Sequence, residues 1–475
     1  MWYVIGLLAA FLAVLVIRAL LFKPLPQREV DSSPVAYDKD AAVTALQKLV
    51  QCKTISYNDP AEEDDAEFEK LISMLPTLYP KVFEVCDFQR LPDRALLLRW
   101  KGKSSEKPAV MMAHYDVVPV REDLWEKPPF AGIIEDGVLW GRGTLDTKVT
   151  LNGSLFAANA LMEQGFVPEN DIYFAYSGGE EVNGKGAPNI VNYFAQQGIT
   201  PYLVVDEGGA VVEKVFPGVK KPCGMVGIAE KGMINLQYTV HSGGGHASAP
   251  PPKTPVTTLA AACRNVVEHP FKMDLNKPAA LMFDTLARHS SFVYKLIFAN
   301  LWCFKPVLNL ICKKSGGEMN ALVRTTTAFT QMEGSKARNV IPAEAHLVSN
   351  MRLSPADSVE SAVTYLKKVV NDDQVELTVL ECQEPSPVSE TDCDSYYKVA
   401  DAVAETWPGC VVTPYLMVQC SDSRHYRDIS NHVYKFSAMD LTAEERKSIH
   451  GNNERIRLET IGKAVEFYLR LLGKC

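Results

Sequence analysis

The sequence has little that would mark a nucleic-acid-binding or fibrous protein. Its 49 basic residues are outnumbered by 57 acidic ones, the formal net charge is −8, and no long stripe of Lys and Arg occurs, so no nucleic acid partner is expected. The 29 glycines and 29 prolines show no repeat, which excludes a collagen-like or low-complexity chain. A length of 475 residues with 47% hydrophobic and 22% charged residues is typical of a globular protein with about two or three domains.

Paired cysteine motifs are also missing. None of the eleven cysteines forms a C-x-x-C pair, which excludes a zinc ribbon or a thioredoxin-type redox site. Because the number is odd, at least one thiol has no disulfide partner within the chain. Buried free thiols in a reducing compartment are the simplest interpretation.

The first residues form the longest apolar run. From Trp2 to Phe22 the only charged residue is Arg18, and about 20 residues are enough for a helix to cross a bilayer. Neither a basic start nor a small-x-small cleavage site is evident, so we expect residues 1–23 to be a retained transmembrane anchor rather than a cleaved signal. A linker over residues 24–40 would follow.

Positive charges gather on the C-terminal side of this run. Arg18, Lys23 and Arg28 lie there, and the positive-inside rule then places the catalytic part of the chain on the cytoplasmic face of the membrane. Free cysteines agree with that placement, since the cytosol keeps thiols reduced.

Strand-like runs alternate with helical patterns from residue 41 to residue 231. Ala109–Ala113, Asp171–Tyr176 and Tyr202–Val205 are short apolar runs that each end in polar residues, and Leu151–Met162 has the pattern of a helix. This order predicts an α/β domain with a mostly parallel sheet covered by helices. Ligands of such sheets gather beyond the carboxyl ends of the strands.

A different pattern begins at about residue 232. Met233–His241 and Ala343–Leu353 alternate like half-exposed strands and are accompanied by helical segments. We therefore expect residues 232–354 to form a small inserted α+β domain, and residues 355–475 to complete the first domain.

One part of this insert is unusually apolar. Residues 280–312 are bulky and hydrophobic, but Lys295, Lys305 and Pro306 interrupt them. The interruptions favour a buried or interface helix, or a surface that dips into a membrane, over a second span.

Polar clusters stand mostly where the strand patterns end. They are His114 with Asp116, Asp146, Glu180 with Glu181, Asp206 with Glu207, and His450. Each alone has an ordinary explanation as a packed histidine, a helix N-cap or a solvated acidic pair. Strand ends lie along one edge of a sheet, however, and carboxylates crowded there repel one another unless divalent cations offset the charge. Imidazoles with carboxylates suit zinc, with manganese or cobalt as close competitors.

The segments around these clusters resemble a known family. The sequence is similar to the zinc-dependent family of aminoacylase, glutamate carboxypeptidase and carboxypeptidase S, most of all to carboxypeptidase S and N-fatty-acyl-amino-acid synthase/hydrolase, over nearly everything after the anchor. The segments that carry the likeness are MMAHYDVVPV, LWGRGTLDTK, YSGGEEV, VVDEGG, EKG, GHASAPP, RTTTAF, ARNVIPAEA and SIHGNNE.

The resemblance implies two metal ions, most simply zinc. One ion would bind to His114 and Asp206, the other to Glu181 and His450, and Asp146 would bridge both. Asp116 would hold the His114 ring, and Glu180 would be the general base. The family's bond after the bridging Asp is commonly cis, which Thr147 in the next position still allows.

The inserted region resembles a lid and dimerisation domain, which implies a homodimer. There His246 would contact the oxyanion, often in the partner's site, and Asn339 and Arg352 would hold the substrate carbonyl and its terminal carboxylate. The bland alternatives are a turn residue for Asn339 and a surface ion pair for Arg352.

The sequence thus predicts a membrane-anchored, two-metal amidohydrolase that cleaves the amide bond to a C-terminal amino acid. The substrate is a small peptide for a carboxypeptidase or dipeptidase, or an N-acyl amino acid for a fatty-acyl-amino-acid hydrolase or synthase. From other classes, an inactive metal-binding protein and a structural scaffold remain alternatives.

Overall fold

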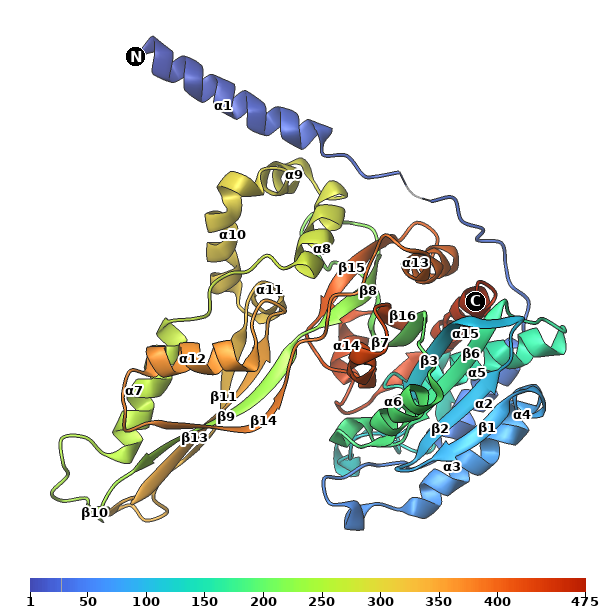
Figure 1. The fold of residues 1–475 in the computed structure, drawn as a ribbon, viewed down its shortest axis with the longest axis horizontal. Helices are drawn as coiled ribbons and strands as arrows, with labels where there is room; N and C mark the ends of the chain where they lie inside the picture. Colours follow the sequence, from blue (N-terminus) through green and yellow to red (C-terminus); the bar gives the residue numbers. More distant parts are fainter. Residues whose placement is uncertain (27) are drawn as a thin grey trace.

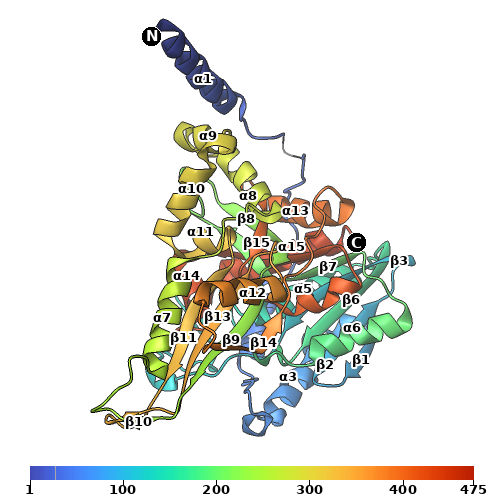
Figure 2. The same cartoon turned by 60° about the vertical axis from the view of Figure 1, so that its left-hand side comes forward.

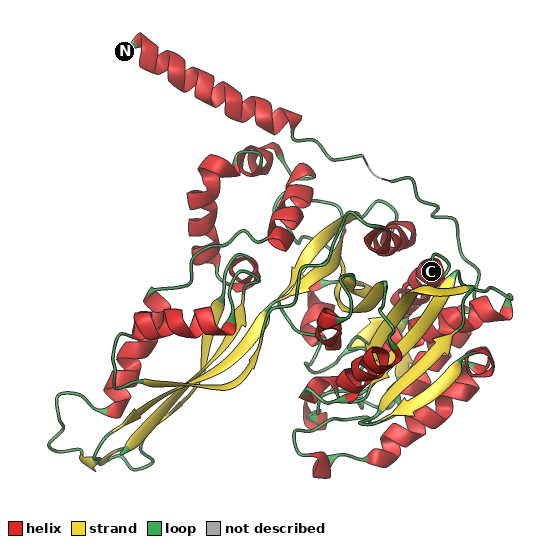
Figure 3. Ribbon diagram, in the orientation of Figure 1, coloured by secondary structure: helices red, strands yellow, loops and turns green. Residues whose placement is uncertain are grey.

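Two β-sheets organise the protein in the computed structural model, which describes residues 1–26 and 28–475 (Figure 1). Gln27, inside the expected linker, lies outside the described residues. An eight-stranded sheet covered by helices forms one half of the molecule, a four-stranded sheet forms the other, and helix α1 (Trp2–Leu21) projects at one end (Figures 1 and 3).

The eight-stranded sheet has the order β1-β2-β6-β3-β7-β16-β8-β15. Its strands are β1 (Asp87–Leu91), β2 (Ala95–Trp100), β3 (Ser104–His114), β6 (Asn170–Ser177), β7 (Leu203–Val212), β8 (Cys223–Glu230), β15 (Val411–Met417) and β16 (Val433–Leu441). Neighbours from β6 through β3 and β7 to β16 are parallel, as are β8 and β15. The hairpin β1–β2 and the pairings of β8 with β7 and β16 are antiparallel, so the expected α/β sheet is of mixed type.

Helices cover both faces of this sheet, which explains why its central strands are apolar without alternation. Met111 of β3 packs into a core with the helices on one face, while its neighbour Val110 packs into a second core on the other. The first face carries α2 (Lys39–Val50), α3 (Asp65–Leu78), α4 (Pro80–Val85), α5 (Lys148–Glu163), α13 (Asp394–Thr406) and α15 (Leu458–Leu472). The second face carries α6 (Gly186–Gln197) and the 3₁₀ segment η4 (Asp422–Asp428).

The four-stranded sheet is antiparallel, in the order β11-β13-β9-β14. Its strands are β9 (Gly232–His241), β11 (Thr326–Glu333), β13 (Glu344–Leu353) and β14 (Glu376–Gln383), and helices α7 (Pro255–Glu268) and α12 (Val359–Val370) share a core with one face. Alternate residues of β13 are buried, as one covered face requires. Helix α12 packs on this sheet, and β14 pairs with β9 within it. The inserted domain therefore extends to Gln383, past residue 354 where we expected it to end.

Shorter elements complete the chain. They are η1 (Pro60–Glu62), η2 (Glu122–Leu124), η3 (Glu180–Val182), α11 (Gly317–Leu322), α14 (Ala443–Ser448), the pair β10 (Gly245–His246) and β12 (Val340–Ile341), and the small sheet of β4 (Ile133–Glu135), β5 (Val138–Trp140) and β17 (Arg455–Arg457).

The apolar segment at 280–312 packs on the eight-stranded sheet rather than on the four-stranded one. It forms α8 (Lys277–Arg288), α9 (Phe292–Phe298) and α10 (Leu301–Ser315), and Phe283 and Leu286 of α8 belong to the large core beside β15. Helices α9 and α10 meet at 109°.

Helix α1 rests against the bend between α9 and α10. The Arg18 guanidinium donates to the Ala299 carbonyl from Nε at 3.1 Å and from Nη2 at 2.9 Å, and the Asn300 amide donates to the Leu15 carbonyl at 3.0 Å. Phe11 meets Trp302 edge to face, with ring centroids 5.9 Å apart. By length and composition α1 could cross a membrane, and α9 with α10 passes the same test as a bent pair.

Candidate metal centre

Two groups of side chains meet at the carboxyl end of the sheet and share one aspartate. The His114 Nε2 lies 3.0 Å from Oδ1 of Asp146, and the His450 Nε2 lies 3.0 Å from Oδ2 of the same carboxylate. Glu181 completes the second group, with Oε2 3.0 Å from the His450 Nε2. His114 ends β3, Asp146 precedes α5, Glu181 follows β6 and His450 follows α14. Distant stretches of sequence therefore converge on the two oxygens of Asp146.

The first group is completed by Glu207, not by Asp206 as we expected. Oε1 of Glu207 lies 3.2 Å from the His114 Nε2, and the ligand atoms of His114, Asp146 and Glu207 lie within 4.8 Å of one another. Neighbouring residues of a strand point to opposite faces, so Asp206 points away, where it accepts the Ser423 N–H at 2.8 Å. Asp206 thus supports η4, and of the two acids it is Glu207 that lies with His114 and Asp146.

Asp116 holds both sides of the centre together. The His114 Nδ1 lies 3.1 Å from the Asp116 carbonyl and 3.4 Å from its Oδ1. The two carboxylate oxygens also accept the backbone N–H groups of Glu180 and Glu181, each at 3.1 Å. This buried carboxylate therefore fixes the ring of one ligand and the backbone of the turn that carries another.

Glu454 is a supporting residue that the sequence reasoning missed. It is fully buried, pairs with Arg142 at 2.6 Å, and accepts the N–H groups of Leu145 at 2.7 Å and Asp146 at 3.3 Å. The loop that presents Asp146 is thereby tied to the loop that presents His450, and the Asp146–Thr147 peptide bond is cis. Its only sequence signal was its place at the end of the segment SIHGNNE.

Crowding of acids dominates the electrostatics of the centre. Burial raises the pKa of Glu180, Glu181 and Glu207, that of Glu207 to about 8, and neighbouring carboxylates add to the rise. Hydrogen bonds to Asp146 and Glu181 raise the pKa of His450 to about 10. Burial opposes charge on His114 too, but Glu207, Asp116 and Asp146 raise its pKa. The carboxylates outnumber the two imidazoles, and bound divalent cations would offset the remaining repulsion.

The donors present fit two such cations. Each group offers one imidazole nitrogen and carboxylate oxygens, a set that suits zinc, manganese or cobalt. Oε1 of Glu181 is buried and has no hydrogen-bond partner among the described residues, so one ligand atom is left for an ion.

Glu180 lies beside both groups. Oε1 of Glu180 is 4.0 Å from the Arg424 guanidinium, which in turn donates to Asn183 at 2.8 Å. Arg424 comes from η4, the segment that Asp206 supports. The acid is thus placed next to the ligands, with one cation in reach.

The residues expected from the insert are divided between two places. Arg352 of β13 lies at the root of the four-stranded sheet, where its Nη1 is 3.4 Å from Sγ of Cys420, just before η4. His246 and Asn339 lie next to each other in and beside the β10–β12 pair, both exposed, at the tip far from the eight-stranded sheet (Figures 1 and 2). The structure therefore brings Arg352 toward the centre and leaves His246 and Asn339 apart from it within one chain.

The α/β sheet with its carboxylate–imidazole groups defines a hydrolase of the metallopeptidase class. Residues 110–474 match the peptidase family M20/M25/M40. The chain belongs to this family, and it is an enzyme.

Relatives and solved structures of this class are similar to most of the chain. A probable carboxypeptidase S-like protein of Dictyostelium discoideum is 35% identical over 90% of this chain and 83% of its own length. An N-fatty-acyl-amino acid synthase/hydrolase of Xenopus tropicalis is 35% identical over 92% of this chain and 86% of its own. A metallo-carboxypeptidase of Sulfolobus solfataricus shares the fold with a TM-score of 0.66 and 17% identity, covering 91% of this chain and 98% of the other.

Proposed function

We propose that the protein is a two-metal amidohydrolase that releases a C-terminal amino acid from a small peptide or an N-acyl amino acid. The observation that carries this proposal is Asp146, whose two oxygens each face the histidine of a separate ligand group. His114, Asp146 and Glu207 would hold one ion, and Asp146, Glu181 and His450 the other. Zinc is the metal we favour, because its catalytic sites use such ligands.

Two bound divalent ions would polarise the scissile carbonyl and lower the pKa of a water. Glu180 would take a proton from the attacking water and later give it to the leaving amide nitrogen. Asp116 would keep His114 and the turn of Glu180 in place, and Glu454 would do the same for Asp146. Arg352 would pair with the terminal carboxylate of the substrate through its planar guanidinium.

The test of this proposal is Glu180→Gln in the full chain. General acid–base catalysis typically contributes about 10²–10⁴-fold, so kcat for amino acid release should fall by that much. Metal content by mass spectrometry should equal that of the wild type, since Glu180 is not a ligand in this proposal. Full activity in the variant would overturn the proton-transfer role. A wild-type protein that binds metal but cleaves no substrate in a screen with zinc, cobalt and manganese would instead support the inactive metal-binding alternative.

A fatty-acyl substrate is the second candidate, favoured by an exposed apolar surface beside α1. The residues of that surface are Phe292, Val293, Trp302, Val307, Leu310 and Ile311. Turnover of N-oleoyl-phenylalanine and of Gly-Leu by the purified protein separates the two substrates. Cleavage of Gly-Leu alone would remove the lipid candidate, and cleavage of the acyl substrate alone would remove the dipeptidase.

We further propose that α1 is a retained anchor with the catalytic part on the cytoplasmic face. The contacts of Arg18 and Asn300 support retention, because a cleaved signal would leave the α9–α10 bend without them. Intact mass of the purified protein tests retention. An acceptor site for N-glycosylation engineered at the exposed C-terminal side of β10 tests orientation, since a cytoplasmic domain stays unmodified.

A homodimer through the four-stranded sheet completes the proposal. His246 and Asn339 are exposed and lie apart from the centre of their own chain, so a second copy is the simplest source of an oxyanion contact. The insert would then act as both lid and dimerisation domain.

A further inference from the structure

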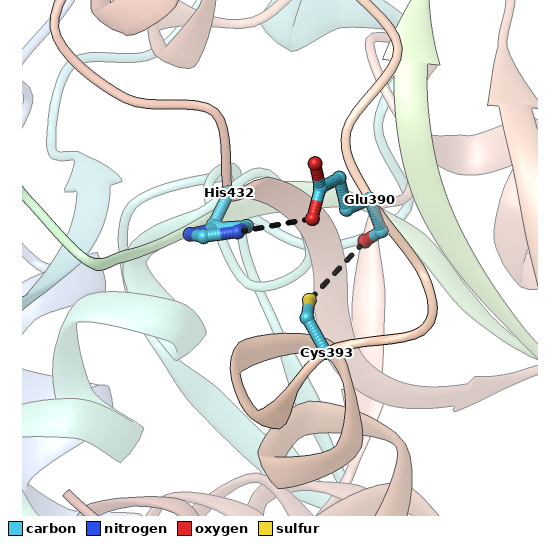
Figure 4. Close-up of side chains that lie close together, drawn as sticks. All are labelled: Glu390, Cys393 and His432. Carbon is cyan, nitrogen blue, oxygen red and sulfur yellow. Dashed lines mark hydrogen bonds and ion pairs between the residues drawn. The ribbon is translucent and has the colours of Figure 1, made fainter.

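A separate group of potential ligands lies at the edge of the eight-stranded sheet where β16 begins, opposite the carboxyl ends of the strands that carry the groups around Asp146. Glu390 belongs to the chain that returns from the four-stranded sheet, Cys393 is the N-cap of α13, and His432 immediately precedes β16. Figure 4 shows the three side chains converging, and their ligand atoms all lie within 4.8 Å of one another. We propose that Glu390, Cys393 and His432 bind a Zn²⁺ ion.

The orientation of His432 is that of a metal ligand. Its Nδ1 lies 3.0 Å from the Tyr202 carbonyl, which only accepts hydrogen bonds, so Nδ1 carries the ring proton. In the neutral ring the lone pair is then on Nε2, which lies 3.8 Å from Oε2 of Glu390. Histidines that bind metals almost always donate their other N–H to a carbonyl or carboxylate in this way.

The sulfur of Cys393 lies beside Glu390, and its thiol donates to the Glu390 carbonyl at 3.6 Å (Figure 4). That hydrogen bond would be given up when the thiol loses its proton to bind an ion. The side chain makes no capping hydrogen bond to α13, and Sγ lies at the N-terminal end of this helix, where the helix dipole favours negative charge. Tyr434 lies 3.3 Å from Sγ through its hydroxyl, which donates to the Glu390 carbonyl at 2.7 Å. The sulfur is therefore held in place without being used by the helix.

The distances suit a tetrahedral zinc ion. Nitrogen and oxygen ligands of zinc lie about 3.4 Å apart when each bond is about 2.1 Å long, close to the 3.8 Å between His432 and Glu390. The Glu390 side chain is 67% exposed, so it is free to close the remaining gap and an ion can enter from solvent. A thiolate among the ligands selects zinc over magnesium or calcium.

Such an ion would fasten the returning chain to the eight-stranded sheet. Ser389, next to Glu390, is already hydrogen-bonded to this sheet. Its N–H donates to the Ile228 carbonyl and its hydroxyl donates to the Val433 carbonyl, each at 2.8 Å. The ion would add a link from this segment to His432. The site would be structural, because it links two segments of the chain and shares no ligand with the groups around Asp146; a water would fill the fourth position of the ion.

Cobalt titration of the full chain, purified in detergent, tests the proposal. A thiolate bound to Co²⁺ gives a charge-transfer band in the near ultraviolet, and the groups around Asp146 contain only nitrogen and oxygen ligands. The wild type should show this band and bind one ion more than Cys393→Ser, which should lack it. Cys382→Ser, which removes an exposed thiol outside this group, is the control and should keep the band.

A second variant guards against misfolding of the cysteine variant. His432→Gln should keep the circular dichroism spectrum, weaken the band and lower the zinc content by one ion per chain. Added zinc should raise the melting temperature of the wild type more than that of either ligand variant. Absence of the band in the wild type, or its persistence in Cys393→Ser, would overturn the proposal.

Discussion

At the edge of the eight-stranded sheet His114, Asp146, Glu181 and Glu207 are buried or half-buried, and the exposed His450 still lies 3.0 Å from Asp146 and from Glu181. At the tip of the four-stranded sheet, by contrast, His246 and Asn339 are exposed and lie apart from these groups. The first group is built by strand ends that the fold itself brings to one edge. The second rests on a narrow antiparallel pair at the end of long strands. Folding of one chain therefore brings the candidate ligands together, whereas the contacts proposed for His246 and Asn339 would need either movement of the insert or a second copy.

Mixing subunits tests this difference most strongly. His246→Ala should lower kcat by about 10²–10³-fold, the effect of losing one oxyanion donor. If His246 acts on the partner subunit, combining His246→Ala with Glu180→Gln should restore about half of wild-type activity, because tandem purification keeps only the mixed dimers and each of these holds one complete site of two. Activity measured after co-expression and tandem purification gives the answer, and no recovery would place His246 in its own chain's site.

Variants of Asp206 and Glu207 test which of these two acids of β7 binds a metal ion and which only supports the site. Glu207→Gln should remove one metal ion and lose activity, since it takes away a ligand. Asp206→Asn should keep both ions and weaken metal affinity or activity by about 10–100-fold, the usual cost of losing a supporting partner. The metal content of each variant after dialysis distinguishes the two roles. Loss of an ion from Asp206→Asn but not from Glu207→Gln would show that Asp206 is the ligand.

Arg352 tests whether the insert contributes to the centre without a partner. Arg352→Ala should lower kcat/KM by about 10–100-fold, as expected for a hydrogen bond to a charged group. The loss should vanish for a substrate whose terminal carboxylate is an amide, and Arg264→Ala, at an exposed position on α7 of the same domain, should change neither substrate. Equal losses on both substrates would exclude carboxylate recognition.

Lys231, at the junction of the two sheets, gives the smallest expected effect. Burial lowers its pKa to about 7 from the ordinary 10.5, with Arg352 adding to the shift, and its ammonium binds the carbonyls of Ala321 and Arg324. Between pH 7 and 10.5 the unfolded chain then holds one proton more, so the free energy of unfolding rises with pH there, by about 1.4 kcal/mol per unit at most. Denaturant titrations of Lys231→Met should show a flatter rise, and an unchanged slope would contradict this role.

Much of the fold was predictable because the burial of each strand leaves a pattern. The run at Ala109–Ala113 is apolar throughout since β3 is covered on both faces, and β13 alternates since one face is open. Strand β7 is also apolar without alternation, because both of its faces are covered. Its sequence therefore does not show which of Asp206 and Glu207 points toward the candidate metal centre. Only the folded strand decides between them.

Other features left no pattern to interpret. Glu454 is a single buried acid whose partners, Arg142 and the loop at Asp146, lie far away in sequence. Glu390 and Cys393 are separated from His432 by a helix and a strand, so no spacing motif joins them. The apolar residues 280–312 predicted a buried or interface helix, or a surface that dips into a membrane. They did not predict that α8 packs beside β15.

The contact between α1 and the α9–α10 bend joins α1 to the rest of the enzyme at a second point besides the linker. The linker alone would leave the orientation of α1 unrestrained. Contacts of Arg18 and Asn300 fix the last turns of α1 to the α9–α10 bend. Just after α1, the Lys23 carbonyl accepts a hydrogen bond from the Arg288 guanidinium at 2.9 Å. With α1 as the membrane anchor proposed above, these contacts would hold the catalytic half at one tilt to the bilayer. Molecules dissolved in that bilayer would then meet the same side of the enzyme at every encounter, which turns a three-dimensional search into a two-dimensional one.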